Sequence, residues 1–348
     1  MSGPVVDVHA HVLLPQLQEL VAGIDPEGWQ EAQDLELRRN GADSQAASGA
    51  MIRERWGLLT DLPARLAAMD AAAVDHQVVS PSPSHYYPFL APDHAVSVAR
   101  RANEEIRDLV AQDPQRLSGL GLSPLQHPSR MVETLRHAVV ECGLRGVEIG
   151  SYGPGVGGGQ HGTVELSDPS LEPFWAAARE LGAVVFLHPF GCSLDERLDR
   201  FYLANTVSQP AENAVALSHL IFSGVLDRYP DLIVIAAHGG GYLPAAIGRS
   251  DRAWAVRPEA RGCQHPPSHY LRRLWFDSLT HDAGQLAALV SAAGADRVLL
   301  GSDFPFDMGS ERPVQEVLDA GLGQAAEAAV LSGNAADLGL GPEPRLRP

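Results

Sequence analysis

Three ionisable side chains lie close together in the first apolar segment of the chain, VVDVHAHVLLP (5–15). Asp7, His9 and His11 alternate there with valine and alanine. Successive side chains of a strand point to opposite faces, so we expect these three to share one face. Two imidazoles at this spacing can bind a single metal ion, while the alternative is a histidine pair satisfied by buried hydrogen bonds.

Further polar residues follow three later apolar segments. His188 ends VVFLH, His238 ends VIAAH, and Asp303 follows LLGS. Each has a simple explanation, as a strand terminus, a turn residue or a helix N-cap. Four apolar segments that all end in potential ligands nevertheless favour a shared metal site.

The proposed ligands have the chemistry that transition metals prefer. His9, His11, His188 and Asp303 offer nitrogen and oxygen atoms suited to Zn²⁺, with Fe²⁺ or Mn²⁺ as alternatives. His238 is then left as an acid or base beside a metal-bound water, whose pKa zinc lowers to about 7. For Asp7 two roles remain open, support of a ligand histidine or a buried structural hydrogen bond.

Eight β-branched segments alternate with helical patterns and would position these residues. Strands are predicted at 4–11, 74–81, 118–124, 145–151, 183–189, 232–239, 274–279 and 297–305. Helices are predicted at 95–112, 129–142, 170–181, 211–228 and 283–294. This alternation predicts a (β/α)8 barrel, in which the carboxyl ends of the strands meet on one face. An open doubly wound sheet is the alternative, weakened because no glycine-rich nucleotide loop follows the first strand.

Two stretches depart from this pattern. Residues 12–64 form a long insertion on the expected catalytic face, where either a lid or a disordered surface excursion would fit. Residues 152–166 are rich in glycine but lack a Walker lysine, so we expect a mobile loop there. The whole chain, 1–348, is predicted to be one metal-dependent barrel domain that contains this insertion.

Composition excludes several classes of partner. The 348 residues are 45% hydrophobic, and 43 acidic residues against 26 basic ones give a net charge of −17, which argues against nucleic acids and membrane surfaces. Cys142, Cys192 and Cys263 are too far apart for a disulfide framework and suit a reducing compartment. With no signal-like or membrane-spanning segment, we expect a cytoplasmic protein.

Several motifs together resemble those of a known superfamily. They are DVHAH, GLGLSP, GVEIG, FLHPF, SGVLDRYPDL followed by AAHGGGYLP, LGSDFPF and LSGNAADLGL. The chain resembles the amidohydrolase superfamily over nearly its whole length. It is most similar to the branch that contains 2-amino-3-carboxymuconate 6-semialdehyde decarboxylase and related non-oxidative decarboxylases. The resemblance implies a single Zn²⁺ bound by His9, His11, His188 and Asp303, with His238 as the catalytic residue.

The absence of lysine bears on the number of metal ions. Many amidohydrolases bridge two metals with a carbamylated lysine, and this chain contains no lysine at all. Glu148 could bridge two metals instead, or be a polar core residue or part of the pocket wall. We therefore expect one metal ion per chain.

An anionic substrate would need arginines, because their guanidinium groups match carboxylates. The resemblance implies that Arg249 reaches the active site of a neighbouring subunit, which predicts a homodimer. Arg53 or Arg55, in the segment MIRERW, resembles the lid arginine of the family. For each of the three, a solvated surface arginine is the alternative.

Aromatic residues are candidates for the pocket wall. The resemblance implies a tryptophan at the position of Phe190, and this departure puts the particular substrate in doubt. His85, Tyr86 and Tyr87 follow the second predicted strand, where a pocket could also form.

The prediction is thus a zinc-dependent decarboxylase that acts on a small carboxylic acid, either carboxymuconate-semialdehyde-like or aromatic. One alternative is a mononuclear metal-dependent hydrolase of an amide, ester or lactone, because the same activated water attacks a carbonyl. A non-catalytic barrel that binds a small acid is the other.

Overall fold

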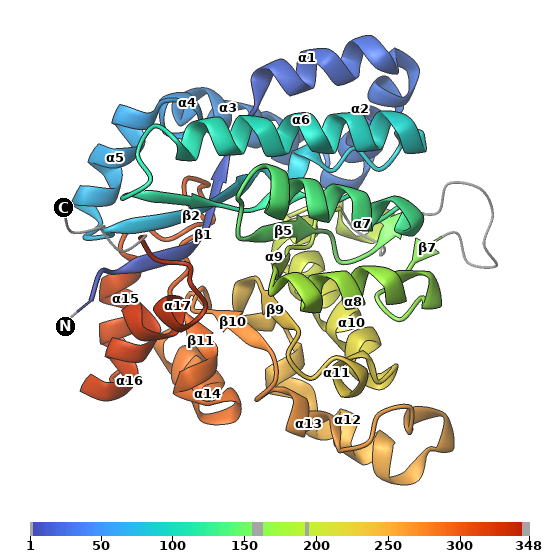
Figure 1. Ribbon diagram of the computed structural model, residues 1–348, viewed down its shortest axis with the longest axis vertical. Coiled ribbons are helices and arrows are strands. Elements are labelled where there is room, and N and C mark those ends of the chain that lie inside the picture. Colours follow the sequence, from blue (N-terminus) through green and yellow to red (C-terminus); the bar gives the residue numbers. More distant parts are fainter. Residues whose placement is uncertain (1–2, 155–162, 192–194, 343–348) are drawn as a thin grey trace.

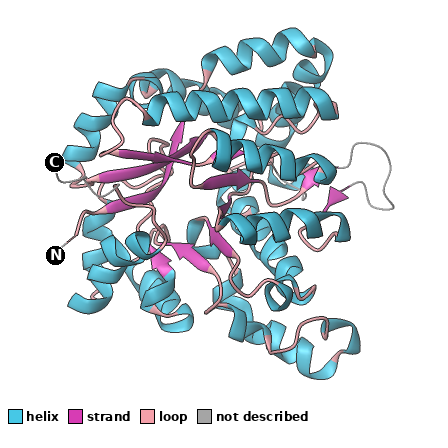
Figure 2. Cartoon of the chain, in the orientation of Figure 1, coloured by secondary structure: helices cyan, strands magenta, loops and turns pink. Residues whose placement is uncertain are grey.

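Parallel strands surrounded by helices form the body of the molecule (Figures 1 and 2). The computed structural model describes residues 3–154, 163–191 and 195–342. The parallel strands are β1 (Val6–Val12), β2 (His76–Pro81), β3 (Leu117–Gly119), β4 (Gly121–Leu122), β5 (Gly146–Ile149), β8 (Val184–Leu187), β9 (Ile233–Ala236), β10 (Trp275–Asp277) and β11 (Val298–Leu299). They form two ladders, β1-β2-β3 and β11-β10-β9-β8-β5-β4.

The two ladders meet at both edges. On one side β3 and β4 are halves of a single segment that is interrupted at Leu120, whose N–H donates to the Val79 carbonyl of β2. On the other side Val8 N–H donates to Leu300 O at 2.9 Å, and Ala10 forms an isolated parallel bridge with Phe304. The eight strand positions therefore follow one another around a barrel, and the predicted (β/α)8 fold is confirmed.

Helices cover the outside of the strands. They include α6 (Pro92–Val110), α7 (Pro128–Arg136), α8 (Glu172–Leu181), α10 (Ser208–Phe222), α11 (Val225–Arg228), α12 (Leu243–Val256), α13 (Pro267–Tyr270), α14 (Ala283–Ala293), α15 (Pro313–Asp319), α16 (Gln324–Ala328) and α17 (Asn334–Asp337). In α6, Val98, Ala102 and Ile106 repeat at helical spacing and are buried. The predicted helix 211–228 is interrupted at Gly224, whose φ of 73° is the left-handed conformation that ends helices.

A bulge in β1 corrects one of our expectations. Val6 and Val8 belong to the apolar cluster inside the barrel, whereas Val5 and Val12 belong to the cluster beneath the helices. The pairing of β1 with β2 shifts register between Asp7 and Ala10. An extra residue in a strand reverses the alternation of its side chains. The prediction that Asp7 shares a face with the two histidines was therefore wrong.

Asp7 instead ties β1 to its neighbours on the helix side of the barrel. Its carboxylate accepts hydrogen bonds from Gln77 Nε2 at 3.0 Å and from Ser302 Oγ at 2.6 Å. Gln77 also accepts a hydrogen bond from the buried Arg65. Asp7 is thus a buried structural hydrogen-bond acceptor, the second of the two roles left open by the sequence.

The insertion after β1 is helical. It contains α1 (Pro15–Ile24), α2 (Pro26–Asn40), α3 (Ala42–Glu54), α4 (Trp56–Thr60) and the start of α5 (Leu62–Ala71). Asp25 and Asp61 accept hydrogen bonds at the N-termini of α2 and α5, as N-cap residues do. Neither α2 nor α3 buries a residue, although a Cβ at Gly41 between them would lie 2.1 Å from Asp199 O. The insertion therefore packs against the segment that follows β8, and its role as a lid stays a prediction.

Part of the glycine-rich stretch lies outside the described residues. β6 (Gly153–Pro154) pairs antiparallel with β7 (Thr163–Val164), and residues 155–162 between them are not described. Cys192 is also outside the described residues, whereas Cys142 and Cys263 are buried free thiols. Within the described ranges, no helix combines the length and apolar character needed to cross a membrane.

Candidate metal centre

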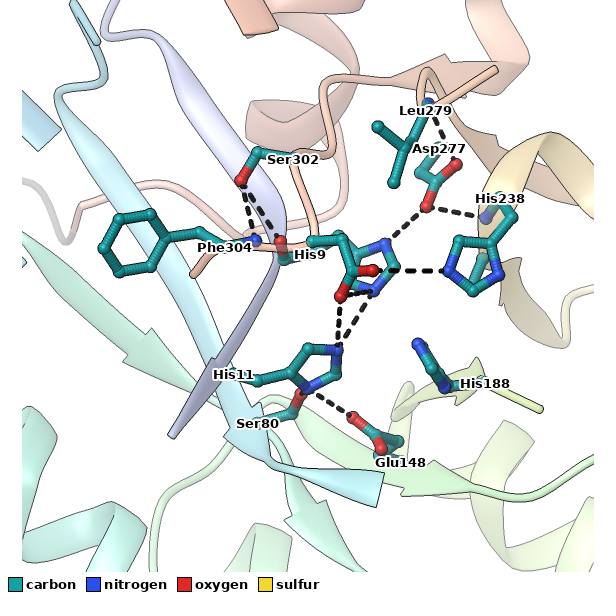
Figure 3. A network of polar contacts seen from close by, with 12 residues as sticks. His9, His11, Ser80, Glu148, His188, His238, Asp277, Leu279, Ser302 and Phe304 are labelled. Carbon is teal, nitrogen blue, oxygen red and sulfur yellow. Dashed lines mark hydrogen bonds and ion pairs between the residues drawn. The ribbon is translucent and has the colours of Figure 1, made fainter. Parts of the chain in front are cut away.

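Four histidines converge at the carboxyl ends of the strands (Figure 3), and Asp303 lies among them. His9 and His11 come from β1, His188 directly follows β8, and His238 and Asp303 lie just beyond β9 and β11. Ligand atoms of His9, His188, His238 and Asp303 all lie within 4.8 Å of one another. His11 joins this group through its Nε2, which is 3.1 Å from His9 Nε2 and 3.2 Å from Asp303 Oδ1. The structure thus brings together all five residues that the sequence singled out.

The loops that carry two of these residues have strained backbones. His238 and Asp303 have φ angles of 54° and 57°, in the left-handed region that non-glycine residues rarely occupy. Such strain is concentrated at functional sites. Gly240, with φ 74°, has no room for a side chain, because a Cβ there would lie 2.6 Å from the Phe276 ring. The glycines after His238 therefore allow this loop to turn tightly over β10.

Three of the histidines are oriented by hydrogen bonds at Nδ1. His9 Nδ1 lies 2.6 Å from Asp277 Oδ2, and His188 Nδ1 lies 2.9 Å from Pro189 O. His11 Nδ1 lies 3.2 Å from Ser80 Oγ. A proton on Nδ1 leaves the Nε2 lone pair free to face the centre, which is how metal-binding histidines are usually held.

Asp277, at the end of β10, is a site residue that the sequence reasoning missed. Besides binding His9, its carboxylate accepts hydrogen bonds from His238 N at 2.9 Å and Gly239 N at 2.7 Å. It therefore fixes both a histidine ring of β1 and the loop after β9. The available signal was a carboxylate that directly follows the apolar run LWF (274–276), similar to the signal that identified His188.

The electrostatic field of the centre suits a cation. Burial alone would raise the pKa of Asp303, but His9, His11 and His238 hold it well below its usual value. Burial and the neighbouring histidines hold the pKa of His188 well below its ordinary value, so this imidazole is neutral. At His9 burial opposes protonation, yet Asp303 and Asp277 raise its pKa to about 10. Two buried carboxylates thus attract positive charge to this point.

The donor atoms fit a divalent metal ion. His188 Nε2 and Asp303 Oδ1 are buried and make no hydrogen bond with the described residues, although His9 Nε2 and His11 Nε2 lie 3.3 and 3.2 Å from Asp303 Oδ1 as ion-pair contacts. A buried polar atom without a partner costs about 1–3 kcal/mol, so such atoms require an explanation. A metal ion bound at this point would coordinate both atoms, and nitrogen and oxygen are the ligands that Zn²⁺, Fe²⁺ and Mn²⁺ accept.

His238 differs from the other histidines in its surroundings. Its side chain is 18% exposed, whereas those of His9 and His11 are fully buried. Its Nε2 lies 3.7 Å from Asp303 Oδ2, and its Nδ1 has no hydrogen-bond partner among the described residues. The His238 ring is therefore more exposed than the rings of His9 and His11 and less restrained by hydrogen bonds.

Glu148 and Phe190 lie on the β5 and β8 side of the centre. Glu148 is buried, with Oε2 3.7 Å from His11 Nδ1, and burial raises its pKa. Phe190 is 38% exposed, and its ring lies 6.2 Å from that of Tyr86. The two aromatic rings thus form one partly open wall beside His188.

The three candidate substrate arginines are in different environments. Arg55 donates to Pro305 O at 2.9 Å and pairs with Glu311, which fastens the insertion to the loop after Asp303. Arg53 is exposed near the end of α3. Arg249 is exposed on α12, and no hydrogen bond or ion pair joins it to the centre within the described part of the chain.

Tyr202 is a second residue near the centre that the sequence reasoning missed. It has a φ of 58°, and its hydroxyl bonds Ser48 of α3. Burial raises the pKa of this phenol to about 12, helped by the charges of Asp307 and Asp303. No local motif marks Tyr202, because only folding brings the segment after β8 towards α3.

Comparisons with known proteins agree with this geometry. A family model described as amidohydrolase matches residues 6–338. The chain is 33% identical to 2-amino-3-carboxymuconate-6-semialdehyde decarboxylase of Dictyostelium discoideum, with 97% of this chain and 92% of that protein aligned. It is 28% identical to gamma-resorcylate decarboxylase of Rhodococcus jostii, over 70% of this chain and 77% of that protein.

A solved structure shares the fold. The 5-carboxyvanillate decarboxylase of Novosphingobium aromaticivorans, solved with manganese and 4-hydroxy-3-methoxy-5-nitrobenzoic acid, aligns with a TM-score of 0.79. The alignment covers 97% of this chain and 96% of that chain at 21% identity. At this level of identity the likeness supports the barrel fold.

Proposed function

This chain belongs to the amidohydrolase family, and from that premise we propose that it is a metal-dependent, non-oxidative decarboxylase. The substrate is a small carboxylic acid, either carboxymuconate-semialdehyde-like or aromatic. The single observation that carries the proposal is the buried group of histidines and Asp303, found in a chain aligned along 97% of its length with a relative named as a decarboxylase. The predicted relationship to the metal-dependent carboxy-lyases of this superfamily is confirmed by these comparisons.

We propose one Zn²⁺ per chain, held by His9, His11, His188 and Asp303. Imidazole nitrogen and carboxylate oxygen are common zinc ligands, and Mn²⁺ or Fe²⁺ could occupy the same set. A divalent ion would act there as a Lewis acid and stabilise negative charge that develops on an oxygen atom. Without lysine the chain cannot form a carbamate bridge, which supports a single ion.

His238 is proposed to move the proton. Decarboxylation breaks the bond between the carboxylate and the adjacent carbon, CO₂ leaves, and the bonding electrons remain on that carbon. A proton must then be added to the carbon. The His238 ring is partly exposed and lies beside Asp303, so we propose that it takes up a proton and delivers it to substrate.

The substrate carboxylate is proposed to be bound by arginine from a second subunit. Arg249 is exposed on α12 and so is available to a neighbouring copy of the chain. Arg53 and Arg55 remain the candidates from the insertion, and Phe190 is proposed to contact the substrate's conjugated plane. We therefore propose a homodimer in which each subunit completes the other's site.

We also propose a cytoplasmic location, with which the buried free thiols of Cys142 and Cys263 agree.

The experiment combines metal analysis with a substrate panel. Purified protein is analysed for bound metal and then incubated with carboxymuconate semialdehyde, hydroxybenzoates, lactones and amides, while CO₂ release and absorbance are followed. We expect about one metal ion per chain and CO₂ release from a carboxylic acid. Turnover of lactones or amides without CO₂ would establish the hydrolase alternative. Absence of both metal and turnover would favour a non-catalytic acid-binding barrel.

A further inference from the structure

His11 is held on the side that faces away from the metal centre by two neighbouring polar groups (Figure 3). Ser80 Oγ lies 3.2 Å from His11 Nδ1, and Glu148 Oε2 lies 3.7 Å from the same nitrogen. Ser80 is the residue of β2 that pairs with His11 of β1. All three side chains are buried, so these contacts are shielded from solvent.

Tyr86 holds the other end of Glu148. Its hydroxyl lies 2.6 Å from Glu148 Oε1 and 3.0 Å from His188 O. The phenol has one proton, so a hydrogen bond to Glu148 Oε1 leaves Glu148 Oε2 to serve another donor. Glu148 Oε2 is buried and has no hydrogen-bond partner among the described residues.

The surroundings of His9 show what such a partner achieves. Asp277 accepts the Nδ1 proton of His9 directly, at 2.6 Å, and so turns Nε2 towards the centre. At His11 the Glu148 carboxylate lies 3.7 Å from Nδ1, which is farther than the Asp277 carboxylate lies from His9 Nδ1. The Ser80 hydroxyl lies closer to His11 Nδ1, at 3.2 Å. A hydroxyl can accept one hydrogen bond while donating another, so it can connect the two groups.

We propose that Ser80, Glu148 and Tyr86 form a positioning chain for His11. The Nδ1 proton of His11 is donated to Ser80 Oγ, the Ser80 hydroxyl proton points to Glu148 Oε2, and Tyr86 donates to Glu148 Oε1. The chain fixes the His11 ring and its tautomer, so that the Nε2 lone pair faces the metal. Glu148 then acts through His11 and is not itself a metal ligand.

The geometry favours this role over a bridge between two metals. A bridging carboxylate would have to approach the Nε2 side of His11, where the ligand atoms meet. Glu148 approaches Nδ1 on the opposite side of the ring, and its other oxygen is bonded to Tyr86. A residue that only packs in the core would not need two oriented oxygen atoms.

This inference rests on the proposed function, because it assumes that His11 binds the metal. The test uses metal-stripped full-length protein titrated with Zn²⁺ against a chelating dye, together with the visible spectrum of the Co²⁺-loaded form. The variants are Ser80→Ala and Glu148→Leu, with the conservative Ser80→Thr and Glu148→Gln. Ser123→Ala is the matched control, because Ser123 is equally buried but bonds Thr134 outside the centre.

We expect Ser80→Ala and Glu148→Leu to lower Zn²⁺ affinity by about 10- to 100-fold and to shift the Co²⁺ bands. Ser80→Thr and Glu148→Gln, which keep an oxygen acceptor, should recover most of the affinity, and Ser123→Ala should match wild type. Should Glu148→Leu fail to fold, Ser80→Ala decides the question.

The outcomes distinguish a failure of the positioning chain from a failure of the proposed metal site. If Ser80→Ala and Glu148→Leu bind Zn²⁺ as wild type does while His11→Ala does not, the positioning chain is wrong and the metal site stands. If wild type binds no ion, or His11→Ala binds as wild type does, the proposed role of His11 is wrong and the chain fails with it.

Discussion

His238 is the histidine of the centre whose ring is held by the fewest hydrogen bonds among the described residues. The other histidines are fixed at Nδ1 by Asp277, Ser80 or the Pro189 carbonyl, whereas Nδ1 of His238 makes no hydrogen bond within the described residues. Its side chain is 18% exposed, whereas the side chains of His9 and His11 are fully buried. These features are the ones we expect of a residue that transfers a proton, beside residues that are proposed to hold an ion.

Replacement of His238 should therefore affect turnover more than metal binding. For His238→Gln we expect kcat to fall by about 10²- to 10⁴-fold, the usual contribution of a general acid or base, with metal content unchanged. Activity and metal per chain are measured on the same preparation, and His188→Gln serves as the variant expected to lose metal. Loss of metal in His238→Gln would instead place His238 among the ligands.

Asp277 should matter through the residues that it orients. In Asp277→Asn one carboxylate oxygen is replaced by an NH₂ group, which cannot accept a hydrogen bond. This group would face the N–H of His9 Nδ1 or of Gly239 in the loop after β9, so one of these hydrogen bonds is lost. We expect Zn²⁺ affinity to fall by about 10- to 100-fold in competition titrations. Asp282→Asn is the control, because Asp282 caps the exposed start of α14. Equal affinities of the two variants would contradict this role.

Among the secondary-structure elements, the start of the insertion is fastened to the segment after β2. His85 Nε2 accepts a hydrogen bond from Leu14 N at 3.0 Å, so the ring proton is on Nδ1 and is donated to Tyr87 Oη at 2.8 Å. Burial lowers the pKa of His85 to about 3. The folded protein thus keeps this histidine neutral at a pH where the unfolded chain, with an ordinary pKa near 6.5, is protonated.

Acid should weaken the fold through His85. Between about pH 6.5 and pH 3 the unfolded state binds the proton and the folded state does not, so stability falls as the pH falls, by at most about 1.4 kcal/mol per pH unit for this group. His85→Gln should destabilise the protein at pH 7, and its penalty should shrink towards pH 4. Urea denaturation at several pH values measures this, with exposed His94→Gln as control. A penalty independent of pH would contradict the neutral, buried His85.

For the assembly as a whole, the proposed dimer makes each site depend on both subunits. Arg249 is exposed on α12, whereas His238 belongs to the centre of its own chain. In a hybrid of one His238→Gln chain and one Arg249→Ala chain, one site carries both changes and the other carries neither.

Combining the two impaired variants in one dimer should therefore restore activity. We expect Arg249→Ala alone to lose at least about 10-fold in kcat/KM, since it removes a charge-assisted contact to the substrate carboxylate. After co-expression with separate affinity tags, the isolated hybrid should recover up to half of the wild-type activity. No recovery in a verified hybrid, or a wild-type protein that is monomeric at assay concentration, would show that Arg249 does not serve a partner.

Much of the fold and of the centre was determined by the sequence itself. Strand and helix periods are local, so strands such as 183–189 and helices such as 283–294 were located to within a few residues. The polar residues that end apolar strands were also recognised locally. In a parallel barrel all strands end on the same face, so His188, His238 and Asp303 had to approach one another.

Only the tertiary structure determined the features that depend on contacts between neighbouring strands, namely the bulge in β1 and the hydrogen-bond partners of the histidines. The bulge in β1 exists only in its pairing with β2, so the sequence alone gave the wrong face for Asp7. Asp277 and Ser80, the partners of His9 and His11, are brought to them by strand pairing and not by sequence proximity. Local alternation reveals which residues can bind a metal, but only the packed barrel determines which groups orient them.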